Sequence, residues 1–466
     1  MAMTSAVVPD NAQGNSWTDG KRWLWLLSPA LPLLAAGSII AVIVGAPSWL
    51  LWSLPFVFYG LVPFFDWFIG EDPINAPESA VGALDADRYY LRIVVAYIPS
   101  QYIATIAGAW LVVNGGLDVL SLIALTFATG MANGVGINTA HELGHKTSAL
   151  ERWLAKITLA PVAYGHFFIE HNKGHHKNVA TFDDPASSRM GESFWAFWPR
   201  TVVGSVKSAW GIERERLARL GQPVWSAKNE NLQAWAMTVL IFGALTVWLG
   251  PWALLFLVVQ AILGFSLLEV VNYLEHYGLM RHKDATGRVE RCLPRHSWNS
   301  NHIVSNLFLY QLQRHSDHHA NPTRRYQALR HFEDSPQLPS GYAAMVLAAY
   351  LPPLWYWLMD KKVVAHHGGD LSKASLHPPA RERLLRRWGG ASPEVITRIV
   401  APVKPAAAGT LAARHQCPNC QYVYDSALGC PAEGYPAGTA WQALPEDWPC
   451  PQCAVRDKPD FIALSL

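Results

Sequence analysis

The sequence predicts an all-α integral membrane protein of six transmembrane helices with a histidine-rich metal site, followed by a small cysteine-rich metal domain. Three observations support this fold class. Only 15% of the 466 residues are charged and 51% are hydrophobic, which is unusual for a soluble enzyme. Several apolar runs approach the length of about 20 residues that crosses a bilayer as a helix. Histidines and cysteines cluster in the polar segments outside these runs.

Six apolar segments are long enough, or nearly so, to span a membrane, and they cover residues 23–44, 49–68, 93–113, 119–140, 235–249 and 252–273. The fifth segment is short, so its helix is expected to begin a few residues earlier. Connections rich in Gly, Pro and Asn at residues 45–48, 114–118 and 249–252 join the spans into hairpins.

The Lys and Arg residues indicate how the chain is oriented. The three hairpin connections contain none, whereas the N-terminal segment, the loop at 141–230 and the chain after 276 contain nearly all of them. By the positive-inside rule, both termini face the cytoplasm and the multi-pass chain lies in the inner (cytoplasmic) membrane, in contact with lipid. Residues 1–22 lack the features of a secretory signal peptide. A net charge of +2 gives no reason to expect a nucleic-acid partner.

Histidines gather in four clusters on the predicted cytoplasmic side: HELGHK (141–146), EHNKGHHKN (170–178), NYLEHYGL (272–279) and LQRHSDHHAN (312–321). Residues i and i+4 share one face of a helix, and three histidine pairs have this spacing where composition predicts about 0.7. Neutral imidazole binds Fe, Zn, Cu or Ni. Nine histidines exceed the coordination of one ion, so two metals are implied; the candidates are His141, His145, His171, His175, His176, His276, His315, His318 and His319.

Four carboxylates adjoin these histidines, namely Glu142, Glu170, Glu275 and Asp317. One interpretation is that they accept hydrogen bonds that fix the imidazole tautomers. The other is ordinary pairing, such as Glu142 with Lys146 at i, i+4. Both interpretations stay open at this point. Four further histidines are expected to be ordinary polar residues of the membrane interface: His166, His282, His296 and His302.

The four histidine clusters together resemble the membrane alkane 1-monooxygenase (alkane omega-hydroxylase) family over about residues 20–360. NYLEHYGL and HSWNSN (296–301) favour this family over the membrane fatty-acid desaturases, which share a broader histidine pattern. The resemblance implies a non-haem diiron site held by the nine histidines without bridging carboxylates. It also implies that O2 and two electrons convert linear alkanes to 1-alkanols. A substrate that enters laterally from the bilayer into an apolar pocket is a hypothesis consistent with it.

Five of the six cysteines lie near the C-terminus, and they predict a second metal site. CPNC (417–420) and CPQC (450–453) form two CxxC pairs, and four thiolates at this spacing bind Zn or Fe in tetrahedral geometry. The expected ligands are Cys417, Cys420, Cys450 and Cys453. Disulfides are not expected on the cytoplasmic side. Cys430 is expected to be a free thiol, and the sequence indicates no role for Cys292.

The segment around these cysteines resembles rubredoxin, a small β-rich domain with one cysteine-bound iron. Its aromatic core would comprise Tyr422, Tyr424, Tyr435, Trp441, Trp448 and Phe461. CAVRDKPDF (453–461) resembles the rubredoxins that serve alkane hydroxylases. Gln421 and Ala454 stand where Gly usually follows each CxxC, and Cys430 stands where an acidic residue is usual. Hydrogen bonds to the sulfurs tune the potential of such an iron, so the sequence with these departures does not predict its value.

These features divide the chain into a transmembrane diiron hydroxylase domain (1–395), a linker (396–413) and a rubredoxin domain (414–466). RERLLRR (381–387) is expected to form a solvated or lipid-surface helix. Electrons would come from NAD(P)H through a separate rubredoxin reductase, because the chain has no GxGxxG fingerprint. Alternatives are a fatty-acyl desaturase or hydroxylase, a methylarene monooxygenase of the same superfamily, and a membrane metal or redox sensor without turnover.

Overall fold

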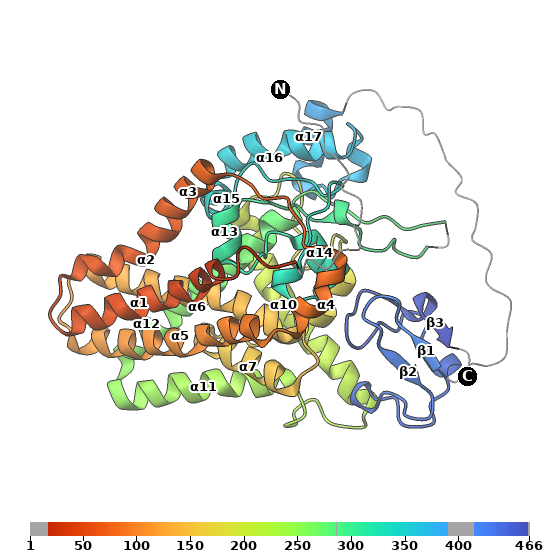
Figure 1. Cartoon of the computed structure of the whole chain (residues 1–466), viewed down its shortest axis with the longest axis horizontal. Helices are drawn as coiled ribbons and strands as arrows, with labels where there is room; N and C mark the ends of the chain where they lie inside the picture. Colours follow the sequence, from red (N-terminus) through yellow and green to blue (C-terminus); the bar gives the residue numbers. More distant parts are fainter. Residues whose placement is uncertain (1–16, 286, 390–413, 465–466) are drawn as a thin grey trace.

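The computed structural model describes residues 17–285, 287–389 and 414–464. A bundle of long helices carries a polar part on one of its ends, and a small C-terminal domain with three short strands lies beside that polar part (Figure 1). The predicted linker at 396–413 lies outside the described residues.

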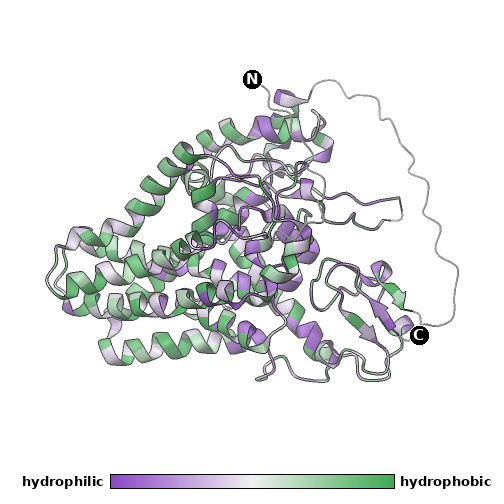
Figure 2. Cartoon of the chain, in the orientation of Figure 1, coloured by the Kyte–Doolittle hydropathy of each residue, from purple (hydrophilic) through white to green (hydrophobic). Residues whose placement is uncertain are grey.

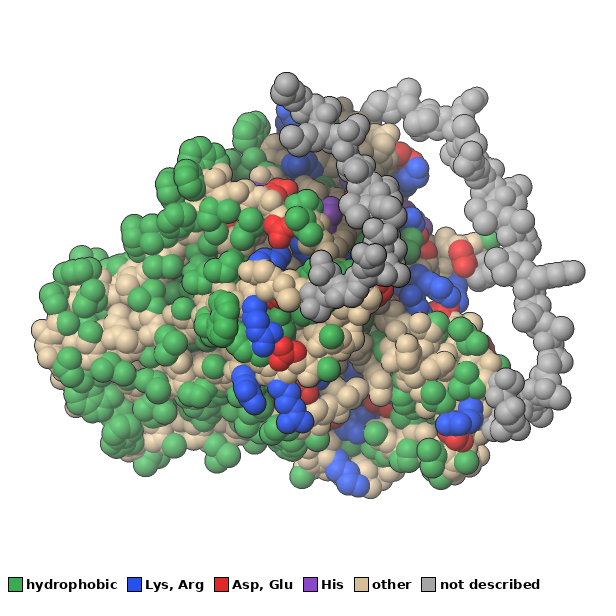
Figure 3. Space-filling view, viewed as in Figure 1, with side chains coloured by type: hydrophobic (Ala, Val, Ile, Leu, Met, Phe, Trp, Pro, Cys, Tyr) green, Lys and Arg blue, Asp and Glu red, His purple; other side chains and the backbone are tan. Residues whose placement is uncertain are grey.

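Six helical segments are long and apolar enough to cross a membrane, which confirms the six predicted spans. The fifth begins at Glu230, a few residues before its apolar run, as expected. Hydrophobic side chains cover this part of the molecule, whereas charged ones gather over the polar part (Figures 2 and 3). The spans comprise η1 (Leu24–Leu26) with α1 (Leu27–Ile43), the series η2 (Ser48–Trp52), α2 (Ser53–Phe56), η3 (Val57–Leu61) and α3 (Val62–Ile69), then α5 (Arg88–Asn114), α6 (Val119–Gly144), α11 (Glu230–Leu249) and α12 (Pro251–Glu275).

The second span changes its helical geometry along its length. It begins as a 3-10 helix and passes through the π-helix η3 before it ends as α3. Pro55 and Pro63 in this segment lack a backbone N–H, so neither can donate the i to i−4 hydrogen bond of a regular α-helix. The segment leans away from the bundle in Figure 1, and α3 packs against α13 (Ile303–Phe308) and α15 (Tyr342–Ala349) of the polar part.

Helices α6 and α12 form the centre of the bundle and lie very close together. A Cβ atom on Gly134 would come within 2.6 Å of the Gly264 carbonyl oxygen, and one on Gly130 within 2.8 Å of the Gln260 carbonyl oxygen. Glycine therefore permits this contact, as is common between membrane helices. Inside the contact, the Asn133 amide donates to Gln260 Oε1 at 2.6 Å. The two helices are thereby held in register, and their polar ends meet.

The polar part is built from shorter helices and loops around those two ends. A π-helix, η5 (Glu170–His175), joins α8 to α9. The predicted basic helix is present as α17, with only Leu384 of its residues buried. The α-helices not yet given are α4 (Glu78–Ala86), α7 (Ala149–Leu159), α8 (Phe167–Ile169), α9 (His176–Asn178), α10 (Phe194–Arg219), α14 (His315–Ala320), α16 (Pro352–His366) and α17 (Arg381–Trp388).

The C-terminal domain holds a three-stranded antiparallel sheet in the order β2-β1-β3. Its strands are β1 (Arg414–Gln416), β2 (Val423–Asp425) and β3 (Ile462–Leu464). The six predicted aromatic residues pack around Tyr424 and Trp448. Trp441 also stacks on His415 with ring centroids 4.0 Å apart. A core this small needs a metal or a disulfide to fold, and the cysteines beside it are free thiols suited to a metal.

Candidate metal centre

The nine histidines singled out in the sequence converge in two groups at the polar end of α6 and α12. In each group, one ring nitrogen of every histidine lies within 4.8 Å of the others, and all nine side chains are buried. The groups are unequal. The larger one contains His141, His145, His171, His176 and His318, and the smaller one contains His175, His276, His315 and His319.

Three segments build the larger group. His141 and His145 are one turn apart at the end of α6, and His318 comes from α14. Nε2 of His318 lies 2.8 Å from Nε2 of His141 and 3.0 Å from Nε2 of His176. Nε2 of His176 lies 3.1 Å from Nε2 of His171. The ring nitrogens therefore surround a common point.

The π-helix η5 determines which histidine joins which group. The i, i+4 spacing predicts that His171 and His175 share a face, but the structure places them in different groups. The backbone N–H of His176 donates to the carbonyl of His171, which is the i to i+5 pattern of a π-helix. In this wider turn His171 and His176 come to the same side. His175 therefore points to the other group.

Helices α12 and α14 supply most of the smaller group. His276 caps the end of α12, and His315 and His319 are one turn apart on α14. Nε2 of His315 lies 2.9 Å from Nε2 of His319 and 3.2 Å from Nε2 of His276. Oε2 of Glu275 is also 3.2 Å from Nε2 of His315. A carboxylate oxygen thus lies among the ring nitrogens of this group.

The donor set fits a pair of iron ions. Imidazole nitrogens bound at about 2.1 Å to one ion lie roughly 3 Å apart, and five pairs of Nε2 atoms within the two groups are 2.8 to 3.2 Å apart. Within the described ranges, Nε2 of His145 and of His175 is buried without a hydrogen-bond partner. Burial and the neighbouring imidazoles lower the pKa of His171 and His318 well below its usual value, so these rings are neutral and able to bind metal. The two groups are consistent with a diiron centre.

Two hydrogen bonds on the outer sides of the rings orient the smaller group. Nδ1 of His175 lies 2.9 Å from Oδ2 of the fully buried Asp184. Nδ1 of His276 donates to the carbonyl oxygen of His296 at 3.0 Å. Such contacts turn Nε2 toward the metal. Sequence reasoning missed Asp184, whose only signal is an acidic pair, Asp183 and Asp184, shortly after the histidine cluster.

Of the four carboxylates predicted near the histidines, Glu275 and Glu142 have different roles. Glu275 contacts His315 as described, and its Oε1 accepts a hydrogen bond from the Tyr342 hydroxyl at 2.9 Å. Glu142 pairs with Lys146 at 3.1 Å, in agreement with the ordinary-pairing interpretation, although both side chains are buried. Only Glu275 therefore reaches a metal-facing nitrogen.

The other two carboxylates serve the surroundings of the site. Asp317 accepts from the Arg324 guanidinium at 2.9 Å and from the Arg330 backbone N–H at 2.8 Å, which fixes the loop after α14. Oε1 of Glu170 is buried and has no hydrogen-bond partner in the described part of the chain. It lies 3.1 Å from where a Cβ of Gly174 would be. Neither carboxylate is shown bonding to a histidine.

The four further histidines lie outside the two groups, as expected. His166 packs on Tyr164 with ring centroids 4.3 Å apart. Nδ1 of His302 lies 2.8 Å from the Ser300 hydroxyl. The other two histidines, His282 and His296, line a separate cavity.

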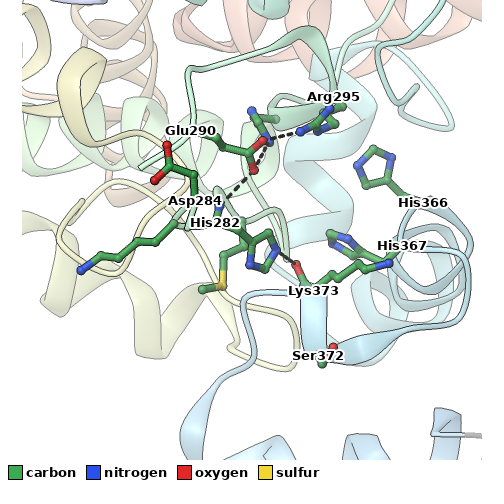
Figure 4. A pocket seen from close by; sticks show the side chains of 11 residues that line it. His282, Asp284, Glu290, Arg295, His366, His367, Ser372 and Lys373 are labelled. Atoms are coloured by element: carbon green, nitrogen blue, oxygen red, sulfur yellow. Dashed lines mark hydrogen bonds and ion pairs between the residues drawn. The ribbon is translucent and has the colours of Figure 1, made fainter. Parts of the chain in front are cut away.

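This cavity has a volume of about 630 Å³, and imidazole and charged side chains face it (Figure 4). Nε2 of His282 lies 3.1 Å from the Lys373 carbonyl oxygen, and Nε2 of His296 lies 3.5 Å from Oε1 of Glu290. Burial alone would raise the pKa of Glu290, but a hydrogen bond from His296 and the charge of Arg295 help to lower it to about 2. In the described residues, the histidines of this cavity do not converge on a common point.

The four predicted cysteines of the C-terminal domain also converge. Sγ of Cys417 lies 3.8 Å from Sγ of Cys453, and Sγ of Cys420 lies 3.5 Å from Sγ of Cys450. Thiolates bound at about 2.3 Å to a tetrahedral ion are roughly 3.8 Å apart. Cys430 is a free thiol in the aromatic core, as expected.

Ion pairs hold the C-terminal domain against the polar part. Two of the cations, Lys173 and Lys177, lie in the segment EHNKGHHKN (170–178). Arg288 lies in the loop between His276 and His296. The pairs are Lys173 with Glu433 (2.5 Å), Lys177 with Asp447 (3.4 Å), and Arg288 (3.0 Å) and Arg291 (2.6 Å) with Asp460. The cysteine site therefore lies beside the segment that carries His171 to His176.

Comparisons with known proteins agree with this architecture. The fatty acid desaturase family model matches residues 119–349, and the rubredoxin family model matches residues 414–461. The alkane 1-monooxygenase of Acinetobacter baylyi is 48% identical over 381 residues, which cover 81% of this chain and 93% of the relative. The alkane 1-monooxygenase of Ectopseudomonas oleovorans is 47% identical over 384 residues, 81% of this chain and 94% of the relative. The chain belongs to the alkane 1-monooxygenase family.

A more distant relative distinguishes this family from its neighbours. The xylene/toluene monooxygenase hydroxylase component of Pseudomonas putida is 29% identical over 240 residues, 52% of this chain and 63% of the relative. The alkane 1-monooxygenases match more of the chain at higher identity, so the methylarene, fatty-acyl and sensor alternatives are not favoured. The C-terminal domain is a rubredoxin with a four-cysteine iron site. Both resemblances seen in the sequence are thereby confirmed.

Proposed function

We propose that this member of the alkane 1-monooxygenase family converts linear alkanes to 1-alkanols. One atom of O2 enters the terminal C–H bond and the other leaves as water, which requires two electrons and two protons. The observation that carries the proposal is the position of the metal centre. The histidine groups lie at the polar ends of α6 and α12, which also line an apolar cavity between the membrane helices. The rubredoxin contacts the segment that carries His171 and His176.

We propose that an alkane chain enters the apolar cavity between the membrane helices. The cavity lies between η3, α6, α12 and α15, and its walls include Phe58, Val135, Val271 and Leu312. The α6, α12 and loop segments that form these walls continue directly into histidine ligands. A chain that lies in the cavity would present one end to the metal centre, which favours terminal attack. Leu268 and Val271 on the α12 wall are only half-buried, which supports entry of the substrate from the bilayer.

The nine histidines would hold two non-haem irons, with five ligands for one ion and four for the other. Bound iron would supply the activation of O2. Oε2 of Glu275 is placed to complete the four-histidine group. The other oxygen of Glu275 accepts from Tyr342, so Tyr342 would keep this carboxylate oriented toward the four-histidine group. Asp184 and the His296 carbonyl would keep His175 and His276 oriented.

The electrons would pass singly through the fused rubredoxin, which is already in contact with the histidine-bearing segment. We infer that they originate from NAD(P)H and reach the rubredoxin through a separate flavoprotein reductase. The sequence has no GxGxxG fingerprint, which supports a separate reductase. The two protons would enter from the polar side of the molecule.

We further propose that the chain lies in the inner (cytoplasmic) membrane, with its termini, metal centre and rubredoxin in the cytoplasm. The hairpin connections without Lys or Arg lie at the end of the bundle opposite the polar part (Figure 1). This distribution of charge supports the orientation. The end of the bundle that carries these connections would then face the periplasm.

Isotope labelling tests the proposed reaction. Cells that contain the chain and a rubredoxin reductase would receive octane, dodecane and hexadecane under 18O2, and products would be identified by mass spectrometry. Labelled 1-alkanols are expected, and a His319→Ala variant should give none. Products from fatty acids or xylene alone would assign the chain to a neighbouring activity. No product from any substrate, despite three bound irons per chain, would overturn the proposal.

A further inference from the structure

The two cysteine loops of the rubredoxin are near copies of each other. We call CPNCQ (417–421) the first cysteine loop and CPQCA (450–454) the second. Gln421 and Ala454 both have positive φ, 62° and 54°, and their N–H groups donate to the carbonyls of Cys417 and Cys450 at 3.0 and 2.9 Å. Because the two loops share this backbone conformation, a difference in exposure between them reflects the residues that lie around them.

The surroundings of the two loops differ. In the first loop Pro418 and Gln421 are exposed and Cys420 is partly exposed. In the second loop Cys453 and Ala454 are only 2% and 6% exposed, although Gln452 at the tip is open. In the second loop, the last cysteine and the residue after it are therefore covered. In the first loop the corresponding residues, Cys420 and Gln421, remain accessible.

The hydroxylase part borders the second loop. A hollow of about 400 Å³ separates the two, and Cys450, Pro451 and Ala454 line one of its sides. Lys173 and Gly174, from the segment that carries the histidines, line the other. No residue of the first loop borders this hollow.

Charge also distinguishes the two faces. Glu433, Asp447, Asp457 and Asp460 surround the second loop, and each pairs with a Lys or Arg of the hydroxylase part. Neither cysteine loop itself carries a charged residue, so the difference lies in the residues around the loops. Asp425, on the strand that follows it, pairs with Arg414 inside the rubredoxin. The carboxylates around the second loop are therefore engaged by the hydroxylase part, whereas the charges beside the first loop pair within the rubredoxin and leave that face for another partner.

We propose that the first cysteine loop is the docking surface for the flavoprotein reductase, while the second loop stays docked on the hydroxylase. The rubredoxin would then work without leaving its place: a reduced flavin gives up its two electrons singly at the first loop, and each leaves by the second. This inference deepens the proposed function and rests on it. The opposing possibility is that the reductase needs the carboxylates around the second loop, so that the rubredoxin must undock for each electron.

A covalent lock separates the two possibilities. A carbodiimide joins a lysine amine to a carboxylate in contact, so it should couple Lys173 to Glu433 and Lys177 to Asp447. Mass spectrometry of cross-linked peptides would verify the lock in the iron-loaded full chain. The matched control is Lys173→Arg with Lys177→Arg, which keeps the charges but cannot be coupled there. Both chains undergo the same treatment.

The readout is the Kd for a purified FAD-containing rubredoxin reductase, measured without alkane. The locked chain is expected to bind it within about twofold of the control. A loss of tenfold or more on locking would overturn the proposal. Because no alkane is present, a failure of the proposed reaction would leave this result unaffected.

Loop variants provide a second, independent measurement. Gln421→Lys and Gln421→Glu place opposite charges on the first loop, and at least one of them is expected to weaken reductase binding tenfold or more. Gln452→Lys and Gln452→Glu, on the exposed tip of the second loop, are expected to change the Kd less than twofold. The reverse ranking would assign the reductase to the second loop and contradict the proposal. The visible spectrum of the iron site would verify that each variant is folded.

Discussion

The two metal sites of this chain are held in opposite ways. The histidine groups draw ligands from positions 141 to 319, on four segments: the ends of α6 and α12, the segment from η5 to α9, and α14. The cysteine site uses two short loops of one small domain. The first site depends on a large helical scaffold that brings these distant segments together. The second stabilises the domain around it, because a domain of this size has little core of its own.

The largest expected effect comes from removing a ligand of the scaffold-held site. His319→Ala should lower alkane hydroxylation by roughly 1,000-fold or more, because metal-assisted chemistry is lost. It should also lower the iron content by about one of three irons while the visible spectrum of the rubredoxin stays intact. Elemental analysis and product assays would check this. His367→Ala, in the cavity of Figure 4, is the matched control and should retain its iron and activity.

The next largest effect is expected from removing a ligand of the cysteine site. Cys450→Ser should lower reductase-driven turnover by roughly 100-fold, because the iron site of the rubredoxin is lost. The histidine-bound irons should remain, and a separately added rubredoxin should restore part of the activity. Cys430→Ser changes a free thiol and serves as the control. Undiminished turnover of Cys450→Ser without added rubredoxin would contradict the electron path.

A smaller effect is expected from weakening the hydrogen bond between Asp184 and His175, on the side of the ring away from the metal. Asp184→Asn weakens the contact that orients His175, and such partners typically contribute 10- to 100-fold in metal affinity or activity. We therefore expect a loss of about 10-fold or more in activity, with faster loss of iron during dialysis against a chelator. Asp183→Asn alters the exposed neighbour and should behave like the unaltered chain. Equal activity and equal iron loss in the two variants would show that Asp184 does not orient a metal ligand.

The smallest effect concerns the contact between the two parts. Arg291→Gln removes one of two cations from Asp460, and the Arg291 side chain is half exposed. Such pairs contribute little, so turnover should fall less than about threefold at low ionic strength. The difference should vanish in 1 M salt, where the Debye length is only about 3 Å. Lys283→Gln changes a nearby exposed charge and should show no such salt dependence.

Residue type and spacing were sufficient to predict the six spans, the nine converging histidines and the four cysteines. These features depend on local apolar length and on ligand chemistry, which the sequence records directly. The division of the histidines was not predictable, because a pattern of i, i+4 pairs assumes an α-helix and η5 is a π-helix. Asp184 was missed for a related reason. It reaches His175 from an irregular loop, where no periodicity marks it.

The π-helix η5 has one consequence for how such a centre could arise. A π-turn is an α-helix with one extra residue, and here the extra residue separates His171 from His176 by five positions. Delete one residue between them and the two would stand four apart on an ordinary helix, still facing the same metal. The smaller group would then have lost the position that His175 occupies. A single inserted codon therefore marks the difference between a helix that serves one ion and a helix that serves two.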